Sequence, residues 1–269
     1  MPDFFIYFVV ILFGLVIGSF ISAYTYRLPK GLSIVKGRSF CPKCHNKISW
    51  FDNIPILSFY LLRGKCRNCG KPISLRYSMI EFFTMSVFLL ITIRYLHCSK
   101  LDITITDFVC SWNNIIGSFN LFYQLFIAAI LVSIFVIDLE KKIIPDRLSL
   151  GLFAIVLLMF IFFNPDYTYK NIFTGFTAAS FLLLVNFVTK GKGMGFGDVK
   201  LALPLGLMLG WPLTISWFLL SFVIGALVGV ALILAKKTTL GKEIPFGPFL
   251  VIGYFLTIIW GDLIILRFF

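Results

Sequence analysis

The feature that most constrains this chain is a succession of apolar runs long enough to cross a lipid bilayer. Of its 269 residues, 59% are hydrophobic, 13% are charged and 32 are Phe. A run of about 18 or more apolar residues forms a helix that spans the hydrocarbon core. This composition excludes a water-soluble domain, because most of the surface must face lipid. We therefore expect an all-α polytopic membrane protein with lipid as its main partner.

About eight segments are predicted to span the membrane. The sixth is short and begins beside a glycine-rich turn. The segments are residues 4–24, 79–96, 116–137, 148–163, 172–188, 199–210, 213–235 and 248–268. They divide the chain into a first transmembrane helix (1–25), a polar loop (26–78) and a larger transmembrane domain (79–269).

The net charge of +12 is unevenly distributed along the chain. Residues 26–78 carry eleven Lys and Arg against Asp52 as the single carboxylate. An eight-span topology puts 20 of the 24 basic residues on one membrane face, which is the positive-inside pattern. The pattern predicts that the amino terminus lies outside and that the 26–78 loop is cytoplasmic. A charge that sets orientation in this way argues against a nucleic-acid partner.

Two Cys-x-x-Cys pairs lie in the polar loop, Cys41/Cys44 and Cys66/Cys69. Two such pairs commonly supply the four sulfurs of a tetrahedral Zn²⁺ site, as in zinc ribbons. A cytoplasmic loop keeps these thiols reduced and available to the metal. The alternative interpretation is two redox disulfides or four unrelated core thiols. We expect a small zinc-ribbon-like module that binds zinc through these four cysteines.

The other two cysteines, Cys98 and Cys110, lie in the second loop, on the predicted outer side. An oxidising compartment would permit a disulfide between them, and a reducing one would leave two free thiols. Both alternatives stay open from the sequence.

Two aspartates beside apolar spans are candidate catalytic residues, Asp138 at the end of the third span and Asp198 at the start of the sixth. The topology brings both to the same membrane face. Two carboxyl groups close together in a low-dielectric site share a proton, so one acts as base toward water and the other as acid toward a peptide carbonyl. Glycines around Asp198 allow an extended substrate to approach closely. This is the chemistry of an aspartic protease.

Simpler interpretations apply to the acidic residues near the spans. Asp198 could cap the helix that follows it. Asp146 precedes the fourth span, where a carboxylate suits the helix dipole, so a structural role is favoured. Glu140 is flanked by two lysines and is expected to be solvated, and Asp262 lies in the last span near the outer face, where it fits a packing or interfacial role.

Several short motifs occur in a fixed order along the chain. They are Gly18-Ser19-Phe20 to Tyr26-Arg27-Leu28-Pro29, the cysteine pairs, Pro72-Ile73-Ser74-Leu75-Arg76-Tyr77 with Glu81, Ile137-Asp138 to Pro145-Asp146, Gly195-Phe196-Gly197-Asp198-Val199-Lys200-Leu201 and Pro245-Phe246-Gly247-Pro248. Together these motifs resemble the bacterial type IV prepilin peptidases. The resemblance covers essentially the whole chain, and its most specific part is the combination of the cysteine loop with Gly-x-Gly-Asp.

The resemblance implies a two-function enzyme of the bacterial inner membrane. Asp138 and Asp198 match the catalytic aspartates of the family. The enzyme would cleave the leader of prepilins and pseudopilins of type IV pili, type II secretion or DNA uptake after a Gly at the cytoplasmic face. It would then methylate the new amino terminus with S-adenosylmethionine, with the zinc loop near the methyl-transfer site.

The chain departs from the family pattern at one place that concerns methylation. An Asn-Val pair usually follows Gly-Ser-Phe-Leu in the family, whereas Ile21-Ser22-Ala23 stands here. Arg76 and Glu81 are candidates for the methyl-transfer region, with a snorkelling Arg and a carboxylate near the start of the second span as the alternative. No glycine-rich fingerprint for S-adenosylmethionine is present. A peptidase with a purely structural zinc loop, and a non-enzymatic scaffold or transporter, are therefore the alternative functions.

Overall fold

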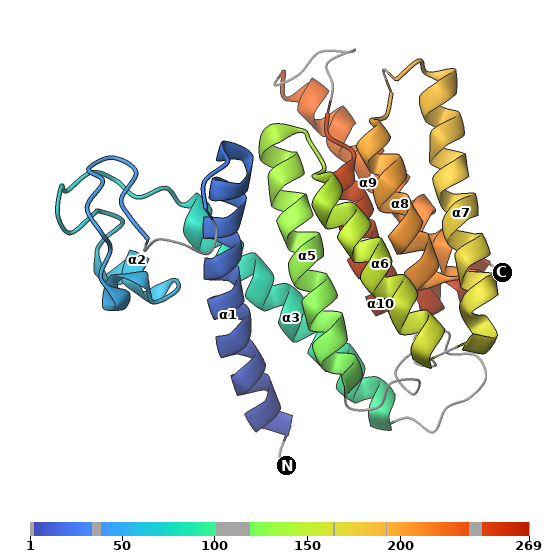
Figure 1. Cartoon of the computed structure of the whole chain (residues 1–269), viewed down its shortest axis with the longest axis horizontal. Coiled ribbons are helices and arrows are strands. Elements are labelled where there is room, and N and C mark those ends of the chain that lie inside the picture. The colour runs from blue at the N-terminus through green and yellow to red at the C-terminus, as the bar shows by residue number, and fades with distance from the viewer. Residues whose placement is uncertain are drawn as a thin grey trace. The chain divides into compact units, whose positions relative to one another are not determined.

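The structure is a computed structural model that describes residues 3–33, 39–100, 119–163, 165–191, 193–236 and 244–268. The described residues are mainly helical and contain two isolated β-bridges but no strand. Figure 1 labels the helices. The elements in chain order are α1 (Asp3–Arg27), η1 (Leu28–Lys30), η2 (Trp50–Asn53), α2 (Leu57–Leu61), α3 (Arg76–Lys100), α5 (Phe119–Lys141), α6 (Asp146–Phe163), α7 (Pro165–Val188), α8 (Phe196–Leu209), α9 (Leu213–Leu234) and α10 (Gly247–Phe268).

The predicted all-α membrane fold is confirmed, with a helix at each of the eight expected spans. Six of these helices are long and apolar enough to cross a membrane, namely α1, α3, α5, α6, α7 and α9. In α10 the described apolar part covers Gly247–Gly261. The other shorter helix, α8, has 14 residues. It is short because it begins after a glycine-rich turn and ends at Gly210, where a φ of +65° is incompatible with an α-helix.

The chain divides into two compact units, Met1–Ile93 and Arg94–Phe269. In the first unit α1 packs closely against α3 through two glycines of α1. A Cβ on Gly14 would lie 2.8 Å from the Met85 Cα, and one on Gly18 would lie 2.7 Å from the Glu81 Cα. Small residues at such crossings let two helix backbones approach in lipid, where no hydrophobic force draws helices together.

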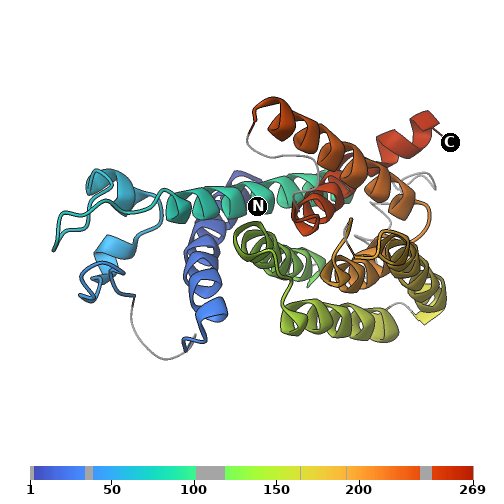
Figure 2. The same cartoon turned by 90° about the horizontal axis from the view of Figure 1, so that it is seen from above.

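The second unit is a helical bundle with α8 in its interior. Figures 1 and 2 show α8 among α6, α7, α9 and α10, and it contacts all four. The α7–α8 crossing again depends on glycine: a Cβ on Gly175 would lie 2.7 Å from the Leu203 carbonyl oxygen, and one on Gly206 would lie 2.8 Å from the Ala178 Cβ. Neighbouring helices rather than lipid thus surround most of α8, and ten of its residues are buried.

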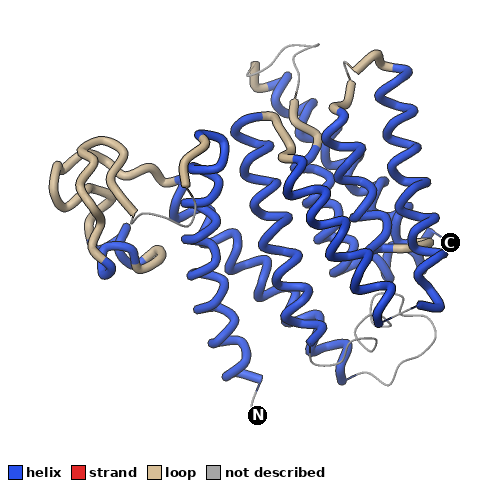
Figure 3. Tube along the Cα trace, in the orientation of Figure 1, coloured by secondary structure: helices blue, strands red, loops and turns tan. Residues whose placement is uncertain are grey.

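Three turns of the second unit meet at one end of its bundle. They follow α5, precede α8 and precede α10, and Figure 3 draws them together as tan loops. The turn after α5 contains Lys142, which has a φ of +55°. Asp138 lies in α5 just before this turn, and Asp198 lies in α8 just after the turn that precedes that helix.

Candidate functional site

Asp138 lies in the last turn of α5 and is buried. Its Oδ2 atom is inaccessible and has no hydrogen-bond partner among the described residues. The carboxyl group packs directly against the backbone of Gly247 at the start of α10: a Cβ on that glycine would lie 2.5 Å from Oδ2. A buried carboxyl group is costly to keep beside apolar spans, so such groups are commonly functional.

Asp198 lies in the first turn of α8 and is also buried. Its Oδ2 accepts a hydrogen bond from the Gly195 backbone N–H at 3.0 Å. The carboxylate therefore does make the helix-start contact that the simpler interpretation expects, and the positive end of the helix dipole favours it there. A side chain at position 195 would not crowd this contact, since a Cβ there would lie at an ordinary 3.5 Å from Oδ2.

The two aspartates belong to one site. They are near enough to interact electrostatically. Ile144, in the turn after α5, packs between the helix starts that frame them: a Cβ on Gly197 would lie 3.1 Å from the Ile144 Cβ, and one on Gly247 would lie 3.1 Å from the Ile144 Cδ1. The glycines at 197 and 247 thus allow α8 and α10 to approach the end of α5.

Gly247 and Ile144 are site residues that the sequence analysis did not single out. The signal for Gly247 was the Pro245-Phe246-Gly247-Pro248 motif, which was noted but given no role. Ile144 carries no chemical signal, because an aliphatic residue between two spans resembles many others. Only its contacts with both helix starts show its position in the site.

The remaining acidic residues near this end are placed differently. Asp146 begins α6 and is exposed, and its Oδ1 accepts a 2.7 Å hydrogen bond from Lys200 Nζ on α8. This ion pair joins the starts of α6 and α8 at the surface. Glu140 is exposed on α5, in the position expected of a solvated residue. The Asp262 side chain lies outside the described residues.

The four cysteines of the polar loop form a cluster. Their sulfurs all lie within 4.8 Å of one another, and none of the four is in a disulfide. Four sulfurs each about 2.3 Å from one zinc ion lie about 3.8 Å apart, so the cluster fits a tetrahedral Zn²⁺. Cys41 is buried and the other three are partly buried. These residues could hold zinc in a closed, four-ligand site of the structural type.

The backbone around the two cysteine pairs has the same hydrogen bonds. In the first pair the Cys41 N–H donates to the Asn46 carbonyl at 3.0 Å and the His45 N–H to the Cys41 carbonyl at 2.8 Å. In the second pair Cys66 bonds Lys71 and Gly70 bonds Cys66, each at 2.9 Å. Both turns therefore fold alike, each with one residue at positive φ, His45 or Gly70.

The hydrogen bonds of the first cysteine turn also favour the thiolate form of Cys41. Burial alone would raise the pKa of the Cys41 thiol, but the backbone N–H groups of Lys43 and Cys44 bond to the sulfur and lower it to about 7. The Cys44 and Cys66 thiols contribute in the same direction. Zinc binds the thiolate form of cysteine, so the lowered pKa suits Cys41 as a ligand. The neighbouring Cys44 thiol has its pKa raised to about 11, because the lowering by the Asn46 backbone N–H is outweighed by burial and by the Cys41 and Cys69 thiols.

Arg76 and Glu81 of α3 each bond another part of the first unit. The Arg76 guanidinium donates to the Ser22 carbonyl at 3.1 Å and to the Thr25 hydroxyl at 2.7 Å, both on α1. Glu81 is buried, and its Oε2 accepts the Ile56 backbone N–H at 2.8 Å. Arg76 therefore joins the start of α3 to α1, and Glu81 joins the polar loop to α3.

Cys98 is buried near the end of α3. Cys110 lies outside the described residues.

Two family models match the chain, and their ranges correspond closely to its two compact units. Residues 12–95 match the family model of the Bacterial Peptidase A24 N-terminal domain, and residues 125–230 match that of the Type IV leader peptidase family. No solved structure matches the chain significantly. The two matches place this many-helix membrane fold, with its buried aspartate pair and its four-cysteine cluster, in the class of membrane-embedded peptidases.

Three curated relatives, each named prepilin leader peptidase/N-methyltransferase, extend over nearly the full chain. The protein of Aeromonas hydrophila is 32% identical over 94% of this chain and 90% of its own length. That of Bacillus subtilis strain 168 is 30% identical over 96% and 95%, and that of Vibrio cholerae is 34% identical over 90% and 91%. The chain therefore belongs to the type IV leader peptidase family and is an enzyme, which confirms the resemblance seen in its motifs.

Proposed function

We propose that this protein is an intramembrane aspartic endopeptidase that removes the leader of type IV prepilins and pseudopilins and then methylates the new amino terminus. The observation that carries the peptidase is the pair of buried aspartates, Asp138 and Asp198, at one end of the second unit. The names of the relatives support the substrate and the second activity.

The proposed cleavage uses the two carboxyl groups as a pair. The ionised carboxylate takes a proton from water while the resulting hydroxide attacks the carbonyl carbon of the scissile bond, and the protonated partner gives its proton to the carbonyl oxygen. Collapse of the tetrahedral intermediate breaks the C–N bond, and the departing amine takes a proton. Gly247 lets the Asp138 carboxyl group pack against the start of α10, since a Cβ at this position would lie 2.5 Å from Oδ2.

The proposed topology follows the basic residues. In it the amino terminus lies outside and residues 26–78 lie in the cytoplasm, since that loop holds eleven Lys and Arg. Residues 1–25 form the first transmembrane helix and residues 79–269 the transmembrane peptidase domain of the inner membrane. The cationic leader of a prepilin would remain on the cytoplasmic side, while its apolar helix lies in lipid.

In the proposed second step, the new terminal amine takes the methyl group of S-adenosylmethionine and loses a proton, leaving S-adenosylhomocysteine. Zinc held by Cys41, Cys44, Cys66 and Cys69 would maintain the fold of the loop. An alternative is a peptidase whose zinc loop is purely structural. A scaffold or transporter that uses the aspartates to bind ions is disfavoured by family membership.

The test of the peptidase is separate substitution of the two aspartates. Asp138→Asn and Asp198→Asn should each abolish cleavage of a purified prepilin, because an amide can neither accept nor supply the required proton. A loss of at least about a thousandfold is expected, the scale seen when one member of a catalytic set is removed. Asp146→Asn is the matched control, since Asp146 lies at the same end of the bundle but forms an exposed ion pair, and it should retain cleavage.

The product reports both activities at once. Mass spectrometry of the pilin after incubation with the enzyme and S-adenosylmethionine should show loss of the leader after Gly and the added mass of one methyl group. Cleavage without methylation would leave the peptidase-only alternative. Retained cleavage in both aspartate variants would exclude the pair as the catalytic groups.

A further inference from the structure

The cysteine module, residues 39–73 around the four clustered cysteines, carries an apolar hairpin at residues 50–61. Such a hairpin is unusual for a water-facing loop. It consists of η2, a short turn and α2. Its largest side chains point away from the module: Trp50 is 75% exposed, Tyr60 80% and Leu61 70%, and Phe51, Ile54 and Leu57 are exposed as well. A surface of this kind on a small module marks a contact with lipid or with another protein.

The depth of the hairpin relative to α1 follows from its hydrogen bonds. The Ile56 N–H donates to Glu81 Oε2 of α3 at 2.8 Å. Gly18, which packs on the Glu81 backbone, precedes the charged end of α1 at Arg27 by about 13 Å along the helix axis at 1.5 Å per residue. The candidate span of α1 covers Phe4–Lys30, so this level lies inside the span rather than beyond its end.

The helices at this level present apolar side chains to their surroundings. On α1 these are Val16 and Phe20, and on α3 they are Met79 and Phe82, all of them exposed. Exposed aliphatic and aromatic residues inside a membrane span face the acyl chains. The hairpin is anchored at the same level and therefore borders lipid.

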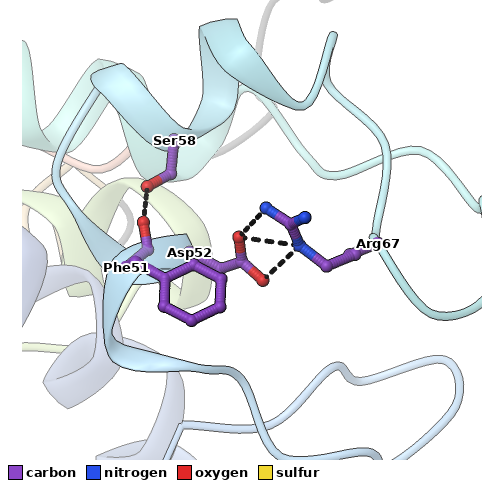
Figure 4. Close-up of polar contacts among 4 residues, drawn as sticks. All are labelled: Phe51, Asp52, Ser58 and Arg67. Carbon is purple, nitrogen blue, oxygen red and sulfur yellow. Dashed lines mark hydrogen bonds and ion pairs between the residues drawn. The ribbon is translucent and has the colours of Figure 1, made fainter.

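Several polar groups of the hairpin are bonded within the protein, which favours insertion into lipid. The backbone N–H of Ser58 donates to Ile54, that of Tyr60 donates to Ile56, and the Ser58 hydroxyl donates to the Phe51 carbonyl. Its one carboxylate, Asp52, forms a two-pronged ion pair with Arg67, with the shortest contact at 2.7 Å (Figure 4).

We propose that the apolar hairpin is inserted among the acyl chains of the cytoplasmic leaflet beside α1 and α3, so that the module is a monotopic membrane element and not a free cytoplasmic loop. Trp50 and Tyr60 suit the interface, where aromatic residues with a polar atom are enriched. The exposed basic residues Lys43, Lys47, Lys65 and Lys71 lie outside the hairpin, where they remain hydrated.

Site-specific photocrosslinking of the full-length protein in vesicles tests this placement. The photoreactive residue p-benzoylphenylalanine is introduced at Tyr60 or, as the matched exposed control, at Lys47, and adducts are identified by mass spectrometry of the peptides. Lipid adducts are expected at position 60 and only background at position 47. They should form in phosphatidylcholine alone and in its mixture with phosphatidylglycerol, because apolar insertion needs no lipid charge.

A second variant links the adduct to the apolar surface. Leu61→Glu places a carboxylate where acyl chains are expected, and it should reduce the lipid adduct at position 60 while zinc content stays unchanged. Equal adducts at positions 60 and 47 would overturn the proposal, and so would adducts that require phosphatidylglycerol or that contain a prepilin or a second copy of this chain. None of these readouts depends on whether the enzyme cleaves or methylates.

Discussion

At the scale of single residues, the site depends as much on a missing side chain as on the carboxylates. Asp138 lies against Gly247, and no larger residue fits that position without displacing the carboxyl group. Asp198 is packed less tightly. Gly195 donates its N–H to the carboxylate, and a Cβ on Gly195 would lie at an ordinary contact distance from Oδ2. The two aspartates therefore differ in how strictly their surroundings fix them.

This difference leads to a prediction for two glycine substitutions. Gly247→Ala places a Cβ 2.5 Å from Asp138 Oδ2, so it should displace that carboxylate and lower the cleavage rate by about a hundredfold. Gly195→Ala places a Cβ 3.5 Å from Asp198 Oδ2 and should have a smaller effect. Initial rates on a purified prepilin measure both.

The control for this pair is Gly151→Ala on α6, where an added Cβ meets no atom within 4 Å, and it should keep full activity. Thermal unfolding of the three variants separates displacement of Asp138 from loss of the fold. Equal rates for the variants at 247 and 195 would contradict the packing explanation.

At the scale of elements, α8 is the helix whose packing positions the chemistry. It carries Asp198 at its first turn and is enclosed by its neighbours through the Gly175 and Gly206 contacts with α7. A 14-residue helix is too short to span a bilayer with its own apolar length. Its place in the bundle is therefore determined by close packing against other helices.

Gly206→Val should accordingly disturb both stability and activity. Its Cβ would meet the Ala178 Cβ at 2.8 Å and force α7 and α8 apart, at a cost of about 1–3 kcal/mol in the free energy of unfolding. Thermal unfolding in detergent and the cleavage rate should both fall.

Gly229→Val on α9 is the matched control, because its added Cβ meets no atom within 4 Å. It should leave stability and cleavage close to those of the unsubstituted protein. A Gly206 variant as stable as this control would show that α7 and α8 do not need their close contact.

Much of this element structure could be predicted from the sequence, and the reason is local. The long helices follow from apolar runs, because each run needs only its own backbone hydrogen bonds to be stable in lipid. The exception is η2 with α2, which lies in a polar loop too short and irregular for a periodic signal. Ile56, which precedes α2, bonds instead to Glu81, 25 residues further along the chain.

At the scale of the whole molecule, the two compact units separate the two proposed activities. The cysteine cluster belongs to the first unit and the aspartate pair to the second. Each unit has its own buried core, with Phe88 and Ile21 in the first and Leu131, Leu201 and Trp217 in the second. Damage to one unit should therefore affect the other activity only weakly.

Removal of zinc tests this separation. Cys41→Ser combined with Cys44→Ser removes two ligands, so bound zinc should fall to background and residues 39–73 should become sensitive to protease. Prepilin cleavage should be retained while amino-terminal methylation is lost. Metal analysis, limited proteolysis and mass spectrometry of the pilin measure the three effects.

Lys47→Gln is the control, since Lys47 is an exposed neighbour of the first cysteine pair and not a ligand. It should keep its zinc and both activities. Undiminished zinc in the double cysteine variant would refute the cluster as the metal site, and loss of cleavage there would show that the first unit also supports the peptidase.

The sequence by itself determined the membrane class, the positions of the long helices and the two Cys-x-x-Cys pairs, because each depends on residues close together in the chain. Only the tertiary structure decided that Asp138 packs on Gly247, that Ile144 lies between two helix starts, and that Glu81 holds Ile56 at the level of Gly18. These contacts join residues distant in sequence through close packing, which depends on how whole helices cross and leaves no periodic pattern in any single segment.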